Sequence, residues 1–141
     1  MLEIAQNNMK GFKNTEFKCL DCQNCPFAEE DFDTVFIGLV LLFTDDAQNV
    51  LDESRRILKP KGSLILAEPD ISYFSNYGKL KFFYRTFTSY WKIPPTVHFF
   101  TLNELQEMLV KSDFKIVQQE ILQDQSNPYS VSANYIKSIA I

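Results

Sequence analysis

Two stretches of the chain are almost continuously apolar, and both are expected to form buried β-strands. The first, Thr34 to Phe43, is rich in Val, Ile and Leu, and the second is Ser63–Ala67. Runs of this length without polar alternation are typical of central strands in a parallel sheet that is covered on both faces. Within the first run we expect the strand itself over Thr34–Gly38, followed by an exit loop.

Apolar residues at helical spacing lie between these two strands. Asp45 or Asp46 can accept the free N–H groups at the start of this helix, and Arg55 and Arg56 lie near its end, where positive charge favours the helix dipole. Pro60 then stops the helix. Similar patterns predict three other helices, over Leu2–Met9, over Leu80–Trp91, and from a Thr101–Glu104 capping box to about Ser112.

Three further segments have strand patterns. Thr15–Leu20 alternates polar and apolar residues, and Lys115–Leu122 and Ala133–Ile141 complete the chain. Strands that alternate with helices predict an α/β fold with a mostly parallel sheet of about five strands and helices on both faces. The length of 141 residues predicts a single domain over 1–141.

Charge and composition narrow the classes of function. The net charge of −4 argues against a nucleic-acid-binding protein, because binding phosphates requires clustered Lys and Arg. No apolar run is long enough to span a membrane, and the first ten residues are too polar for a signal peptide. We therefore expect a cytoplasmic protein with no membrane partner. Thirteen Phe and six Tyr predict a well-filled core, an apolar ligand pocket or a subunit interface.

Cys19, Cys22 and Cys25 form a C-x-x-C-x-x-C run. This spacing allows an iron–sulfur or zinc site. The alternative is that the three cysteines are reduced thiols that act as small apolar side chains. We expect no metal, because a fourth ligand is required and His98 is the only histidine in the sequence that could supply a nitrogen ligand. His98 itself is expected to be a packed or surface histidine rather than a catalytic base.

The stretch from Cys19 to Pro69 resembles the middle of a class I S-adenosylmethionine-dependent methyltransferase of the small-molecule type. The resemblance rests on Phe32-Asp33, on the sequence R-I-L-K-P-K-G over residues 56–62, and on Glu68-Pro69. The segments at both ends are similar to flanking parts of the same family. The resemblance implies a Rossmann-like methyltransferase fold that lacks its first two strands, so that the chain corresponds to the C-terminal two-thirds of the family domain.

The same resemblance implies a partial cofactor site. Asp21 stands where the family has an acidic residue that accepts a hydrogen bond from the adenine amino group, and Cys22 follows it beside the ring. Ile37, Gly38 and Leu39 match the strand end beside the methionyl group. The glycine-rich loop and the ribose-binding acid of the family have no counterpart here. We therefore expect S-adenosylmethionine to bind weakly or not at all. Asp21 could instead cap a turn, and Gly38 could be a close-packing glycine.

These observations favour a methyltransferase acting on a small molecule, with its catalytic residues unassigned. One alternative is a non-catalytic methyltransferase-like binding or assembly module, and another is a metal-binding domain organised by the cysteines. Without the family's first two strands, Thr34–Gly38 would have an open edge. Either Thr15–Leu20 moves in to pair with it, or two copies join there. We expect a homodimer.

Overall fold

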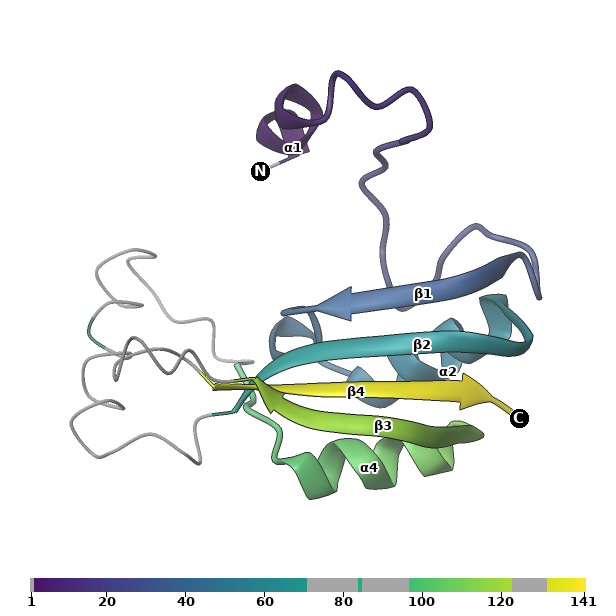
Figure 1. The fold of residues 1–141 in the computed structure, drawn as a ribbon, viewed down its shortest axis with the longest axis vertical. Coiled ribbons are helices and arrows are strands. Elements are labelled where there is room, and N and C mark those ends of the chain that lie inside the picture. The colour runs from purple at the N-terminus through teal and green to yellow at the C-terminus, as the bar shows by residue number, and fades with distance from the viewer. Residues whose placement is uncertain (1, 71–83, 85–96, 123–131) are drawn as a thin grey trace.

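The computed structural model describes residues 2–70, 84, 97–122 and 132–141. Within these ranges the chain forms a four-stranded sheet in the order β1-β2-β4-β3, flanked by helices (Figure 1). The strands are β1 (Phe32–Gly38), β2 (Leu58–Asp70), β3 (Phe114–Leu122) and β4 (Ser132–Ala140). The helices are α1 (Leu2–Asn8), the 3-10 helix η1 (Leu41–Phe43), α2 (Ala47–Ile57) and α4 (Leu102–Lys111).

The sheet is mixed, so the prediction of a mostly parallel sheet of about five strands is wrong. β1 runs parallel to β2, whereas β4 is antiparallel to both β2 and β3. The connection from Leu122 to Ser132 is too short for a helical crossover, which parallel neighbours need. The chain therefore turns back directly from β3 and inserts β4 between β2 and β3.

The predicted strand over Thr15–Leu20 is also wrong, because this segment pairs with no strand in the described ranges. Its side chains are exposed apart from the partly buried Phe17, and the Thr15 hydroxyl donates to the Phe12 carbonyl at 2.9 Å. Alternation favours a strand only where a partner and a buried face exist. The rearranged sheet with this segment beside β1 is not formed.

Helices α2 and α4 cover the same face of the sheet. Val50 and Leu51 of α2 and Leu105 and Leu109 of α4 belong to one buried cluster with Leu64, Leu66 and Ile136 of the strands. Both helices begin as predicted, because the Asp46 side chain accepts from the Asn49 N–H and Thr101 forms a capping box with Glu104. No second helical layer that buries side chains lies within the described residues, since α1 has none buried.

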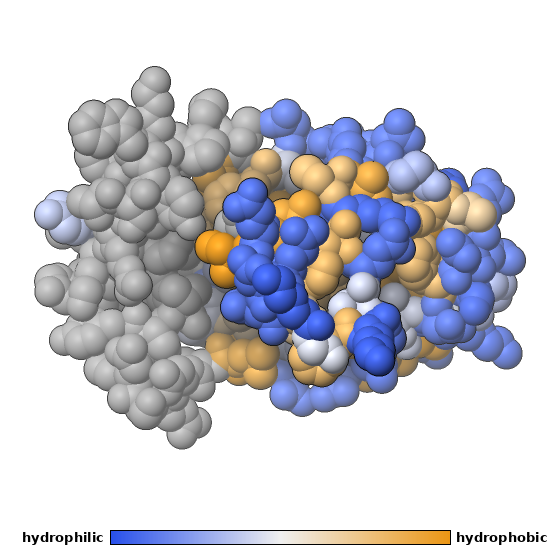
Figure 2. Space-filling view, turned by 90° about the horizontal axis from the view of Figure 1, so that it is seen from above, coloured by the Kyte–Doolittle hydropathy of each residue, from blue (hydrophilic) through white to orange (hydrophobic). Residues whose placement is uncertain are grey.

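The other face and the outer edge of β1 are open in the described part of the chain. Phe36 points to this face and is 66% exposed, and Leu39 beyond the strand is 58% exposed. Figure 2, which looks down on the β1 side of the molecule, shows hydrophobic residues between polar ones. β1 is therefore an edge strand rather than the covered central strand that its apolar sequence predicts. The open edge itself was expected.

No helix in residues 2–70, 97–122 or 132–141 is long and apolar enough to cross a membrane. The predicted helix over Leu80–Trp91 lies outside the described residues, apart from Tyr84. The strands predicted near the C-terminus are confirmed as β3 and β4.

Candidate functional site

The turn after β1 is the most constrained part of the carboxyl edge of the sheet. Leu39 follows Gly38 with a φ of 58°, a left-handed conformation that costs a non-glycine residue about 1–2 kcal/mol. Its N–H donates to the Ala67 carbonyl of β2 at 3.0 Å. This hydrogen bond holds the turn against the neighbouring strand, and η1 begins two residues after Leu39.

A buried carboxyl group supports this turn from β2. Glu68 is 1% exposed, and its Oε1 accepts from the backbone N–H groups of Val40 at 2.9 Å and Leu41 at 3.0 Å. Burial raises the pKa of Glu68, while the backbone hydrogen bonds from Leu41, Val40 and Leu42 oppose that rise. The carboxyl group thus caps the first N–H groups of η1, where the helix end favours an acceptor.

Polar side chains continue from Glu68 along the same buried face. Asn134 of β4 is in register with Glu68 and fully buried, and its Nδ2 donates to Oδ2 of Asp70 at 3.0 Å. Glu68 Oε2 and Asn134 Oδ1 are buried without a hydrogen-bond partner. A buried polar atom without a partner costs about 1–3 kcal/mol. Natural proteins keep few such atoms, so this pair calls for an explanation.

The sequence contains a signal for this cluster, although neither of its carboxyl groups was predicted as a site residue. Glu68 and Asp70 stand two residues apart at the end of an apolar strand, so they must lie on the same face of it. Since Leu64 and Leu66 of that face are buried, both carboxyl groups are expected to be buried as well. Their partner Asn134 could not be found, because strand register is a tertiary property.

The segment from Asp21 to Phe27 is held against α2 by side chains of that helix. Arg56 donates to the carbonyls of Phe27 at 3.0 Å and Cys25 at 3.2 Å. Glu53 accepts from the Cys25 N–H at 2.9 Å and pairs with Arg56 at 2.7 Å. The hydrogen bond from Arg56 lowers the pKa of Glu53. One ion pair therefore fixes this loop at several points.

Asp21 caps its own turn, the alternative that the sequence left open. Its Oδ1 accepts from the Gln23 N–H at 2.9 Å. Cys22 packs against the main core, and Ile37 is buried within it. No hydrogen bond in the described parts of the chain links Asp21 and Cys22 to Gly38 and Leu39. The five residues therefore remain a predicted site. Its two parts, Asp21–Cys22 and Ile37–Leu39, are each held in place by contacts of their own.

Gly38 is not a close-packing glycine against fixed backbone. A Cβ built on it would meet only ring atoms of Phe36, the nearest at 2.7 Å. Since Phe36 is largely exposed, its ring can rotate away. The backbone beside Gly38 is therefore accessible to a ligand once that ring moves.

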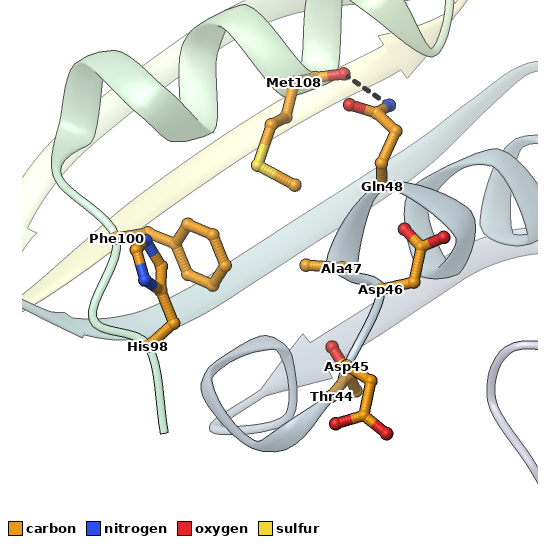
Figure 3. Close-up of a pocket in the computed structure, with 8 residues that line it drawn as sticks. All are labelled: Thr44, Asp45, Asp46, Ala47, Gln48, His98, Phe100 and Met108. Carbon is orange, nitrogen blue, oxygen red and sulfur yellow. Dashed lines mark hydrogen bonds between the residues drawn. The ribbon is translucent and has the colours of Figure 1, made fainter. Parts of the chain in front are cut away.

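A cavity of about 380 Å³ opens between the start of α2 and the segment that leads into α4. In Figure 3 the side chains of Ala47, Phe100 and Met108 lie toward one another, and Gln48 donates to the Met108 carbonyl at 3.2 Å. His98 lies at the rim, edge-on to Phe100 with ring centroids 4.5 Å apart and largely exposed. Its backbone N–H donates to the Leu42 carbonyl at 3.1 Å. His98 is thus a surface residue tied to the turn after β1.

The three cysteines are free thiols. Cys25 Sγ donates to the Asp21 carbonyl at 3.4 Å, and burial raises the pKa of both the Cys22 and Cys25 thiols. Within the described ranges no three His, Cys, Asp or Glu side chains are placed to hold a metal ion.

These residues fit part of S-adenosylmethionine, the cofactor that the sequence resemblance implies. Asp21 keeps one carboxyl oxygen outside its own turn bond, which could accept from an amino group. The backbone at Gly38 and Leu39 ends a strand at the carboxyl edge, where ligands bind in open α/β sheets. No two glycines of the chain form a G-x-G pair, so the sequence has no counterpart of the family's glycine-rich loop.

Comparison with known proteins finds similarity to methyltransferases. A family model for a methyltransferase domain matches residues 1–66. A demethylmenaquinone methyltransferase of Thermotoga maritima is 38% identical over 87 residues, which make up 60% of this chain and 36% of that protein. A demethylmenaquinone methyltransferase of Lactobacillus johnsonii is 31% identical over 140 residues, or 83% of this chain and 54% of that protein. The chain thus spans between about a third and half of these relatives' length.

Solved structures share the fold. The crystal structure of a SAM-dependent methyltransferase from Methanosarcina mazei superposes with a TM-score of 0.71 and 19% identity, covering 99% of this chain and 77% of that one. Because the sequence identity is this low, the superposition shows only that the two proteins share the arrangement of strands and helices.

Proposed function

We propose that the chain is a class I S-adenosylmethionine-dependent methyltransferase and that it takes part in methyl transfer from S-adenosylmethionine to a small molecule. The observation that carries the proposal is the family match over residues 1–66. That range contains all five predicted cofactor residues, Asp21, Cys22, Ile37, Gly38 and Leu39.

The chain's own residues would bind and orient the reactants. S-adenosylmethionine supplies a methyl group on a positively charged sulfur. Asp21 would accept from the adenine amino group with its second oxygen, and the backbone at Gly38 and Leu39 would lie along the methionyl part. Methyl transfer of this kind depends mainly on proximity and alignment. The rigid turn after β1 would provide that alignment without a general base.

The proposal is tested by calorimetry with S-adenosylmethionine and its demethylated product. We expect a dissociation constant between about 10 µM and 1 mM, because two ribose hydrogen bonds are absent from the described site. Asp21→Asn should weaken binding further, whereas Asp113→Asn, on the turn between α4 and β3, should not. Complete absence of binding at millimolar ligand would contradict the proposal and favour a non-catalytic module.

The first methyl acceptor to test is a soluble short-chain demethylmenaquinone, since the relatives compared above are demethylmenaquinone methyltransferases. Transfer of a labelled methyl group should increase with chain concentration. If S-adenosylmethionine binds but no small molecule is methylated, the proposed class of methyl acceptor is wrong, and the proposed cofactor is not.

A further inference from the structure

We propose that Glu68 is a positioning residue for the turn at Val40–Leu42 and that it acts as a neutral carboxylic acid, with a proton shared between its Oε2 and Oδ1 of Asn134. The importance of this turn for the cofactor rests on the function proposed above. The shared proton does not, because it follows from the buried groups themselves.

Two buried side-chain oxygens among the described residues lack hydrogen-bond partners. Glu68 Oε2 and Asn134 Oδ1 are both buried, both unpaired, and belong to residues that face each other across β2 and β4. An ionised carboxylate and an amide oxygen only accept hydrogen bonds. One proton on Oε2 converts this pair of acceptors into a donor and an acceptor, and satisfies both atoms at once.

Turning the Asn134 amide around would cost a hydrogen bond that the structure contains. In that orientation Nδ2 would donate to Glu68, but the amide oxygen would then face Oδ2 of Asp70, which Nδ2 contacts at 3.0 Å in the structure. In the orientation of the structure that bond is kept, and Glu68 Oε2 and Asn134 Oδ1 are the two acceptors without a donor. The almost complete burial of Glu68 raises its pKa, which favours Glu68 as the group that holds it.

The other oxygen of Glu68 gives the proposal its positioning role. Oε1 holds the N–H groups of Val40 and Leu41, directly after the strained Leu39. Two other titratable residues are linked to the surroundings of Glu68 by hydrogen bonds. Asp70 accepts from the Asn134 amide, and the backbone N–H of His98 donates to the Leu42 carbonyl of the turn. Loss of the carboxyl group would leave buried backbone donors unpaired and release the turn.

The shared proton is tested by infrared spectroscopy of the 141-residue chain. At neutral pH we expect the carbonyl band of a protonated carboxylic acid, absent from Glu68→Gln and retained in Glu107→Gln, which alters an exposed glutamate of α4. Absence of the band in the wild-type chain at neutral pH, or its persistence in Glu68→Gln, would overturn the shared proton. This measurement requires no ligand.

The positioning role is tested with two variants that differ in hydrogen bonding. Gln at position 68 can still accept from Val40 and Leu41 and can donate to Asn134, so its affinity for S-adenosylhomocysteine should stay within about threefold of wild type. Glu68→Leu should weaken that affinity by about tenfold or more, and should shift the amide NMR signals of Val40 and Leu41, which Glu68→Gln largely preserves.

A loss in Glu68→Gln equal to that in Glu68→Leu would show that the charge is needed, and would overturn the neutral acid. Unchanged amide signals in Glu68→Leu would overturn the positioning role. If the wild-type chain binds no cofactor, the proposed function fails, while the infrared band and the amide signals still decide the role of Glu68. If Glu68→Leu does not fold, the cofactor affinity and amide signals of Glu68→Gln and the infrared band decide the role of Glu68.

Discussion

Leu39 holds a backbone conformation that glycine adopts without strain. Its side chain is mostly exposed, so replacing it removes little packing. We expect Leu39→Gly to be more stable than Leu39→Ala by about 0.5–1 kcal/mol, because relief of the left-handed strain outweighs the greater freedom of glycine in the unfolded chain. Urea unfolding of the two variants measures the difference.

The matched control for Leu39 is an exposed position in regular helix. At Glu107 in α4 the order should reverse, with Glu107→Gly less stable than Glu107→Ala by about 1 kcal/mol. If glycine is also the worse residue at position 39, the turn is not strained.

The pKa of Glu68 also makes stability depend on pH. Because its folded pKa is raised, the folded chain holds the proton more tightly than the unfolded chain. The resulting stabilisation is complete below the unfolded pKa and is lost as pH rises through the folded pKa. Glu53 and Glu104 have lowered pKa values, so their contribution is present above the unfolded pKa and is lost as pH falls through the folded values.

The measurement compares melting temperatures of the wild type and Glu68→Gln from about pH 5 to pH 8. The wild type should lose stability relative to Glu68→Gln as pH rises, since the amide cannot ionise. In a second series at acid pH, Glu104→Gln should show the opposite trend, with its stability deficit against the wild type shrinking as pH falls through the lowered pKa of Glu104. Parallel curves for the wild type and Glu68→Gln would indicate that Glu68 does not titrate on unfolding.

At the scale of elements, the loop from Asp21 to Phe27 depends on α2 for its position. Arg56→Met removes the bonds to the Phe27 and Cys25 carbonyls and leaves Glu53 without its ion-pair partner. We expect Cys22 and Cys25 to react several times faster with a thiol reagent in the folded protein, because their partial burial requires the anchored loop. The neighbouring Arg55→Met is the control, since Arg55 donates to the Ile141 carbonyl at the other end of the chain.

The elements with local signals were predictable from sequence. Asp46 and the Thr101–Glu104 box mark helix starts whatever surrounds them, and the apolar runs mark β1 and β2. The failures involve pairing. Thr15–Leu20 has the alternation of a strand but no partner in the described part of the chain. β2 already begins at Leu58, two residues before the Pro60 at which the helix was expected to stop.

The candidate site was predictable only in part, for the same reason. Family resemblance could assign Asp21 and Gly38 to a site, because sequence positions carry over from relatives. The pairing of Glu68 with Asn134 depends on the register of β2 and β4, in which these two residues are 66 positions apart in the sequence. No local pattern of the sequence contains that register.

At the scale of the whole molecule, we propose that two copies associate through the open edge of β1. The strand has unpaired backbone groups at that edge in the described part of the chain, and Phe36 is exposed beside it. Exposed, apolar strand edges favour pairing with another chain. The exposed Ile4 and Phe12 near the N-terminus offer further apolar surface to a second copy.

Light scattering measures this association. The wild type should have about twice the mass of the 16.4 kDa chain, and Phe36→Lys should shift it toward monomer. Val110→Lys, a similar change at an exposed apolar residue of α4, should leave the mass unchanged. A wild-type monomer at tens of micromolar would exclude the dimer.

The central place of β2 has a consequence for the order in which the chain folds. β1, α2 and β2 are consecutive, so their contacts close short loops, whereas β4 reaches β2 only after the rest of the chain has been traversed. Local contacts form sooner than distant ones. In pulse-labelled hydrogen exchange, amides shared by β1 and β2 should gain protection before those of β4. At equilibrium, Leu64 and Leu66, enclosed between two strands, should exchange most slowly.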